Sequence, residues 1–65
     1  MANKEFYTKK IGNLELCLVC GWVGDNKCVV FYRNHKGDTT IDFGILDRKL
    51  AFETFDNEVK KNGNR

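Results

Sequence analysis

The side chains best suited to chemistry in this sequence are three cysteines and its single histidine. Cys17 and Cys20 form a C-x₂-C pair, Cys28 follows after seven intervening residues, and His35 follows after six more. Thiolates and imidazoles are the usual ligands of Zn²⁺ at tetrahedral structural sites. One hypothesis is therefore a small zinc-stabilised module whose ligands are Cys17, Cys20, Cys28 and His35.

Strand geometry argues against this zinc site. Cys17 and Cys20 lie in an alternating apolar segment, and side chains three positions apart on a regular strand point to opposite faces of the sheet. The sequence also lacks the second C-x₂-C pair that would make the zinc pattern specific. We therefore expect the cysteines to be small buried apolar side chains, with no metal and no other cofactor.

His35 also lacks the partners that catalysis requires. It falls in a predicted turn beside Lys36 and Gly37, and the sequence places no Ser, Cys or Asp beside it as nucleophile or orienting group. Cys28 begins a predicted strand, where no helix N-terminus is available to lower its pKa. We expect no catalytic residues, and we predict that the protein is not an enzyme.

Length and charge limit the protein to one small domain with modest electrostatics. The chain has 65 residues, with 11 Lys and Arg against 9 Asp and Glu, a net charge of +2. No apolar run approaches the roughly 20 residues that span a bilayer, so no membrane association is expected. The first ten residues lack the apolar core of an export signal, and the cysteine count is odd. We therefore predict a cytoplasmic protein without a disulfide framework.

The hydrophobic pattern predicts an α+β fold, a four-stranded antiparallel β-meander followed by one C-terminal α-helix. Gly12-Asn13 is a typical two-residue hairpin turn, and two further polar turns separate the later strands. From Asp47 the apolar spacing changes from the period of a strand to that of a helix. The predicted elements of this single domain, residues 1–65, are strands at about 5–11, 14–23, 28–34 and 39–46 and a helix at about 48–61.

Alternation along the strands predicts that both faces of this sheet are apolar. One face is expected to carry Tyr7, Ile11, Leu14, Leu16, Leu18, Cys20, Trp22, Val29 and Phe31, and the other Val19, Val23, Val30, Tyr32, Ile41, Phe43 and Ile45. One helix can cover only one face, and a domain of this size is only marginally stable alone. We expect a homodimer that covers the second face. The alternative is a sheet so twisted that a single core forms.

Aromatic and basic residues suggest an alternative function. Trp22, Phe31, Tyr32 and Tyr7 occur among Lys9, Lys10, Lys27, Arg33 and Lys36, and such a surface can bind single-stranded nucleic acid by base stacking and phosphate contacts. The ββββα element order resembles that of a single-stranded-DNA-binding fold, a dimer of curved sheets each followed by a helix. The near-neutral charge weighs against nucleic acid.

Our first functional hypothesis is a non-enzymatic binding protein. Its size and lack of a catalytic constellation are similar to phage or prophage accessory proteins, which inhibit or modulate a larger host protein complex by stoichiometric binding, here in the host cytoplasm. Large rings and arginine dominate the binding energy of protein interfaces. The candidate binding residues are Trp22, Phe31, Tyr32, Arg33 and Lys27.

Overall fold

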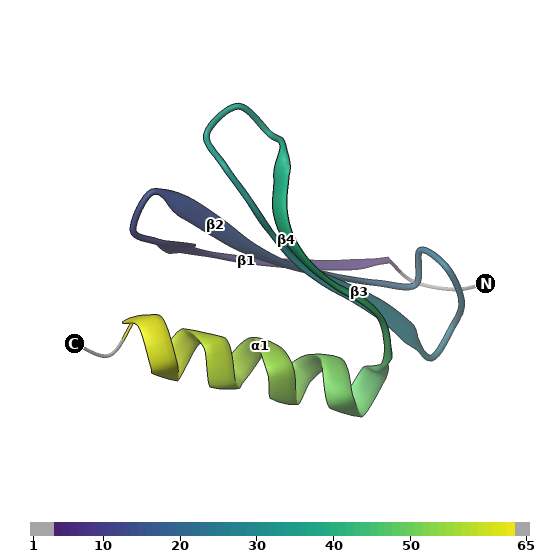
Figure 1. Ribbon diagram of the computed structural model, residues 1–65. Helices are drawn as coiled ribbons and strands as arrows, with labels where there is room; N and C mark the ends of the chain where they lie inside the picture. The colour runs from purple at the N-terminus through teal and green to yellow at the C-terminus, as the bar shows by residue number, and fades with distance from the viewer. Residues whose placement is uncertain (1–3, 64–65) are drawn as a thin grey trace.

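The computed structural model describes residues 4–63, which form one antiparallel sheet and one helix in the order ββββα (Figure 1). This confirms the predicted α+β fold class. The sheet order is β1-β2-β3-β4, so each strand pairs with its neighbours in sequence. The elements are β1 (Glu5–Ile11), β2 (Leu14–Cys20), β3 (Lys27–Arg33), β4 (Thr39–Asp47) and α1 (Arg48–Gly63).

The first hairpin has the two-residue turn that Gly12-Asn13 predicts. Gly12 takes a left-handed conformation (φ 62°), and the two-residue turn that it forms with Asn13 places Ile11 opposite Leu14. Pairing then continues without a shift to Glu5 opposite Cys20. Because a two-residue turn fixes which residues of the two strands are paired, the sequence of the turn sets the register of both strands.

The second strand ends three residues earlier than predicted. It ends at Cys20, and Gly21 then turns the chain away with a left-handed φ of 80°. An irregular segment follows, and β3 begins at Lys27. Alternation therefore does not continue through this turn.

Because β2 ends early, each side chain of β3 points to the opposite face from the one that we predicted. Val30 lies opposite Leu18, and Tyr32 lies opposite Leu16. Val29 pairs with Val19 on the other face. The prediction that Val29 and Phe31 share a face with the leucines of β2 is wrong, and the prediction for Val30 and Tyr32 is wrong for the same reason.

The last strand changes face partway along its length. Pairing with β3 shifts between Val30 and Phe31, where Gly44 has φ 85° and its backbone N–H donates to Asp42 Oδ1 at 2.8 Å. This irregularity is the bulge that a glycine within a strand indicates. As a result Phe43 packs on the helix side, whereas Ile45 pairs with Val29 on the opposite side.

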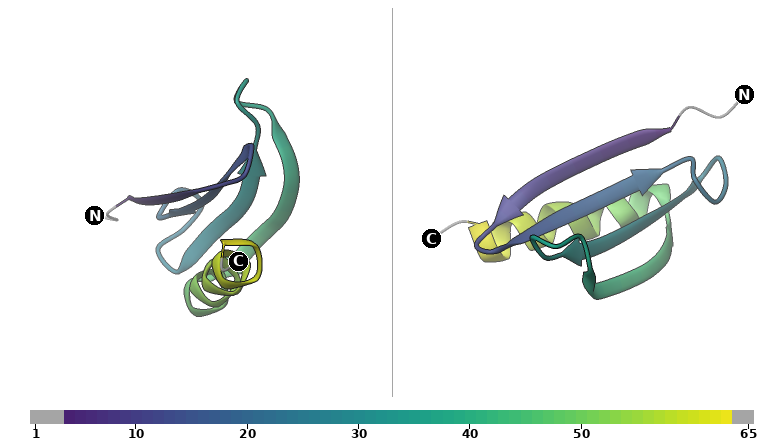
Figure 2. Two further views of the ribbon diagram at one scale, coloured as in Figure 1. Left: turned by 90° about the vertical axis from the view of Figure 1, so that its left-hand side faces the viewer. Right: turned by 90° about the horizontal axis from the view of Figure 1, so that it is seen from above.

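The core lies between α1 and one face of the sheet, with the helix running along the strands beneath them (Figures 1 and 2). Its fully buried members are Leu16, Leu18, Cys20, Cys28, Val30 and Ala51, with Tyr32 nearly so. Phe52, Phe55 and Val59 of the helix pack against them. Among residues 4–63 no helix is both long and apolar enough to cross a bilayer.

Two contacts fix where the helix begins. Asp47 ends β4 and Arg48 starts α1, so no loop residue separates the two elements. The Arg48 backbone N–H donates to the Asn26 carbonyl oxygen at 2.9 Å, in the turn between β2 and β3. The Arg48 guanidinium also forms an ion pair with Glu5 of β1 at 2.7 Å. The start of the helix is therefore held at both edge strands of the sheet, at β4 by the chain itself and at β1 by the ion pair.

Cys20 and Cys28 form a disulfide on the helix-covered side of the sheet. The two residues are direct cross-strand partners in adjacent strands, with a Cα–Cα distance of 4.1 Å. The expectation of three unlinked cysteines is therefore wrong. Alternation alone did not identify the pair, because the register that places the two residues opposite each other depends on the irregular turn.

Candidate binding face

One face of the sheet carries no covering element in the part of the chain that the structure describes (Figure 2, right). We call it the open face. It contains six large apolar residues from all four strands and from the turn after β2, namely Phe6, Val19, Trp22, Val29, Phe31 and Ile45. Trp22 is 63% exposed, Ile45 61% and Phe6 56%. Such a contiguous apolar patch is typical of an interaction site.

Trp22 reaches the open face because β2 ends before it. The turn at Gly21 redirects the chain, and the indole lies with Val29, Phe31 and Ile45 around a shallow hollow of about 250 Å³. Asp42 also lines this hollow, and its carboxylate accepts the hydrogen bond from the Gly44 backbone. The bulge in β4 thus provides both an apolar wall, Ile45, and a polar rim.

Arg33 crosses the open face. From β3 it pairs with Glu15 of β2 at 2.7 Å, and its guanidinium lies 5.9 Å from the centre of the Phe6 ring on β1. The hydrogen bond to Glu15 raises the pKa of Arg33, which therefore stays charged. The side chain thus spans β2 and presents a fixed cation beside an exposed aromatic ring.

The formal charges on this face balance. Lys27 pairs with Asp47 at 3.0 Å at one end, and Arg33 pairs with Glu15 towards the other. A surface with paired charges at its ends and apolar side chains between them does not attract a polyanion strongly. Its composition is closer to that of a protein interface, with a ring of polar residues around an apolar centre.

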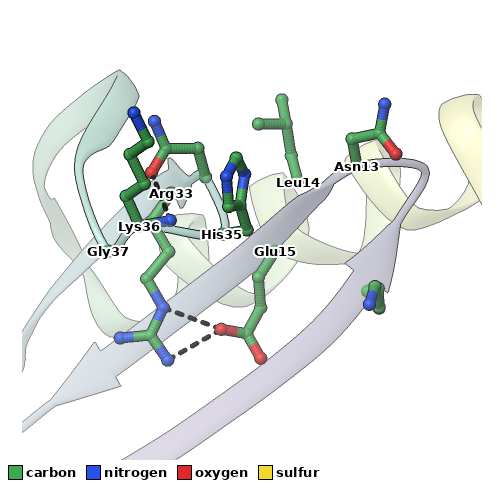
Figure 3. A pocket seen from close by; sticks show the side chains of 9 residues that line it. Asn13, Leu14, Glu15, Arg33, His35, Lys36 and Gly37 are labelled. Carbon is green, nitrogen blue, oxygen red and sulfur yellow. Dashed lines mark hydrogen bonds and ion pairs between the residues drawn. The ribbon is translucent and has the colours of Figure 1, made fainter.

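A second hollow of about 470 Å³ lies where the turns after β1 and β3 meet (Figure 3). Lys10, Lys36, His35 and the Arg33–Glu15 pair contribute to its lining. Figure 3 shows the Glu15 carboxylate held by Arg33, with the His35 ring directed away from that pair. The residues of this hollow therefore do not bring the carboxylate and the imidazole together for acid–base chemistry.

The structure does not assemble the proposed zinc ligands. Cys20 and Cys28 are joined in the disulfide, and Cys17 is buried on the opposite side of β2. Across residues 4–63 there is no group of three or more His, Cys, Asp or Glu side chains that could hold a metal ion. Cys17, Cys20, Cys28 and His35 therefore do not form a metal site in this structure. Burial raises the pKa of the Cys17 thiol, which keeps it protonated and weakly reactive.

The structure brings together three of the five predicted binding residues. Trp22, Phe31 and Arg33 lie on the open face, and Lys27 lies at its end in the ion pair with Asp47. Tyr32 is buried beneath the helix, where its hydroxyl donates to Glu58 Oε1 at 2.8 Å. It cannot present its ring to a partner on the open face.

Sequence reasoning did not single out Phe6 or Ile45 as binding residues. The signal for Phe6 was available, because the register of the first hairpin places it opposite Val19. Ile45 depends on the bulge at Gly44, which a simple alternating pattern does not locate. Both are among the most exposed large apolar side chains of the described residues.

No protein-family model, curated protein or solved structure matches this chain. Its function must therefore be inferred from the geometry of the open face.

Proposed function

We propose that this protein is a non-enzymatic binding module that contacts a larger protein through its open face. The observation that carries this proposal is the exposure of Trp22, Ile45 and Phe6 together on the sheet surface opposite the helix. A partner that covered these side chains would gain a favourable free energy of about 25 cal/mol for each Å² of apolar surface removed from water. The open face also carries a tryptophan and an arginine, two of the residue types that are enriched among energetically dominant interface residues.

Stoichiometric binding gives such a module a way to act without chemistry. By occupying a surface of a larger complex, it would inhibit or modulate that complex, as phage accessory proteins do to host machinery. The rigid sheet supports this role, because its strands hold the rings in place before binding and little ordering cost remains.

Capture of the partner from an extract of the native host, with matched variants, tests the proposal. Trp22→Ala should weaken the affinity for the captured protein at least tenfold, because a central interface tryptophan typically contributes more than about 1.4 kcal/mol. Leu50→Ala is the control, since Leu50 is 48% exposed but belongs to the helix. Equal binding by wild type and Trp22→Ala, with both folded by circular dichroism, would contradict the proposal.

Single-stranded nucleic acid is the second candidate, because Phe6, Trp22 and Phe31 place three aromatic rings on the same face. Base stacking on such rings contributes about 1–3 kcal/mol per base. A labelled oligonucleotide that binds at low salt, with affinity lost in Trp22→Ala and in Lys27→Ala, would favour this candidate. Absence of binding at low salt would exclude it.

A further inference from the structure

The two edges of the sheet differ in regularity. Pairing of β4 with β3 shifts at two places, between Val30 and Phe31 and between Tyr32 and Arg33. Pairing of β1 with β2 runs through all seven residues of Glu5–Ile11 without a shift. Bulges protect an edge from further strand pairing, and a regular edge remains available for it. The β1 edge is therefore the one able to accept another strand.

The hairpin turn determines which backbone groups of β1 point outward. A two-residue turn makes Ile11 and Leu14 a hydrogen-bonded pair, and such pairs alternate with non-hydrogen-bonded pairs along the ladder. The N–H and C=O groups of Phe6, Thr8 and Lys10 consequently face away from β2. No other segment among residues 4–63 runs along this edge (Figure 2, right).

We propose that β1 pairs with β1 of a second copy of this chain, antiparallel and centred on Thr8. This register places Thr8 opposite Thr8, Phe6 opposite Lys10, Tyr7 opposite Lys9 and Glu5 opposite Ile11. Each of the three outward-facing residues then exchanges both backbone hydrogen bonds with its partner. The two four-stranded sheets become one continuous sheet of eight strands.

The charges of β1 select this register over its neighbours. Centred on Thr8, the pairing uses all seven residues of the strand and places no two like charges directly opposite each other. Centring on Tyr7 instead would place Lys4 opposite Lys10, and centring on Lys9 would place Lys9 opposite itself. The chosen register also lays the aliphatic part of Lys10 against the exposed Phe6 ring, and that of Lys9 against Tyr7.

Such a dimer differs from one in which two open faces stack on each other. Residues directly opposite in an antiparallel pair point to the same side, so both open faces would lie on one side of the joined sheet. Both helices would lie on the other side. The dimer therefore leaves Trp22 of each copy exposed and would present two binding faces side by side. This inference does not depend on the proposed function, since the dimer can form whether or not the open face binds a protein.

Size-exclusion chromatography with light scattering tests the dimer. The wild type should have twice the 7.5 kDa mass of one chain. Thr8→Pro removes an outward N–H that no hydrogen bond within the sheet requires, so its mass should fall to that of one chain. Thr8→Val is the matched control, because it keeps the N–H and the β-branched shape, and it should remain dimeric. A monomeric wild type or a dimeric Thr8→Pro would overturn the proposal, as would dissociation of a dimer by Trp22→Ala.

Cysteine cross-linking covers the case in which Thr8→Pro does not fold. Thr8 lies opposite Cys17 within the chain, so Thr8→Cys is made together with Cys17→Ala to prevent an internal bond. Opposed residues in this ladder lie about 5.5 Å apart between Cα atoms, a separation that a disulfide spans. Oxidation should yield a covalent dimer. Thr40→Cys on the β4 edge, in the same Cys17→Ala background, should not yield one, and equal cross-linking at both positions would overturn the proposal.

Discussion

The two faces of the sheet are built from the same strands but have opposite relations to water. On the covered face, Leu16, Leu18 and Val30 have no exposed surface beneath α1. On the open face, Phe6 and Ile45 remain more than half exposed. The comparison shows that an alternating strand pattern creates two apolar surfaces, and that the helix alone decides which of them becomes the core. Stability should therefore depend on the covered face and recognition on the open one.

The largest expected difference between the two faces is the loss of stability on truncating two adjacent valines. Val30 is fully buried towards the helix, whereas Val29 is partly exposed on the open face. Val30→Ala should lower the free energy of unfolding by about 2–3 kcal/mol, from lost burial and the cavity left behind. Val29→Ala should cost less than about 1 kcal/mol, because water already reaches this side chain. Urea denaturation measures both, and equal costs would show that the open face is covered in solution.

The next test concerns the disulfide on the covered face. Replacing both Cys20 and Cys28 by Ala should lower the free energy of unfolding by about 2–3 kcal/mol, because the cross-link restricts the unfolded chain. Cys17→Ala, which removes one buried sulfur and no cross-link, should cost about 1 kcal/mol. Thiol titration of the unfolded, unreduced protein should find a single thiol, that of Cys17. Three titrating thiols would contradict the assignment.

The smallest expected effect lies at the rim of the covered face, where Glu5 binds Arg48. The hydrogen bond from Arg48, and then that from Tyr7, lowers the pKa of Glu5 below its ordinary 4.5. Because the folded pKa is depressed, this stabilisation is present above the unfolded pKa and is lost as pH falls through the folded value. The wild type should therefore lose more stability on acidification below pH 4.5 than Glu5→Gln does.

Urea denaturation repeated from pH 6 to about pH 2 measures this difference. Glu53→Gln serves as a control, because it removes a carboxylate from the exposed side of α1 and leaves the Arg48 contact intact. Parallel pH profiles for the wild type and Glu5→Gln would show that the ion pair does not help to hold the edge strand to the helix.

The parts of the fold that local chemistry determines could be predicted from sequence. Gly12-Asn13 set the whole register of β1 and β2, and the change of period after Asp47 located the helix. The faces of β3 could not be predicted, because their phase depends on the path from Gly21 to Asn26 and not on alternation. The disulfide was missed for the same reason, since it follows from that register.

For the candidate site, the sequence predicted suitable residue types but not which of them face outward. Trp22, Phe31 and Arg33 were chosen as large rings and a cation, and the structure places them on one surface. Tyr32 has the same chemical character but lies on the covered face with its hydroxyl bonded to Glu58. Residue type indicated which side chains could bind, but only the register decided which of them face outward.

The direct join between Asp47 and Arg48 has a consequence for how the molecule can move. A helix that leaves a strand without intervening residues has no hinge, and here its first backbone N–H is held by Asn26 and its first side chain by Glu5. Swinging the helix away would require these bonds and the end of β4 to break together. A binding partner is therefore expected to reach the sheet at its open face or at the β1 edge, and not on the side that α1 covers.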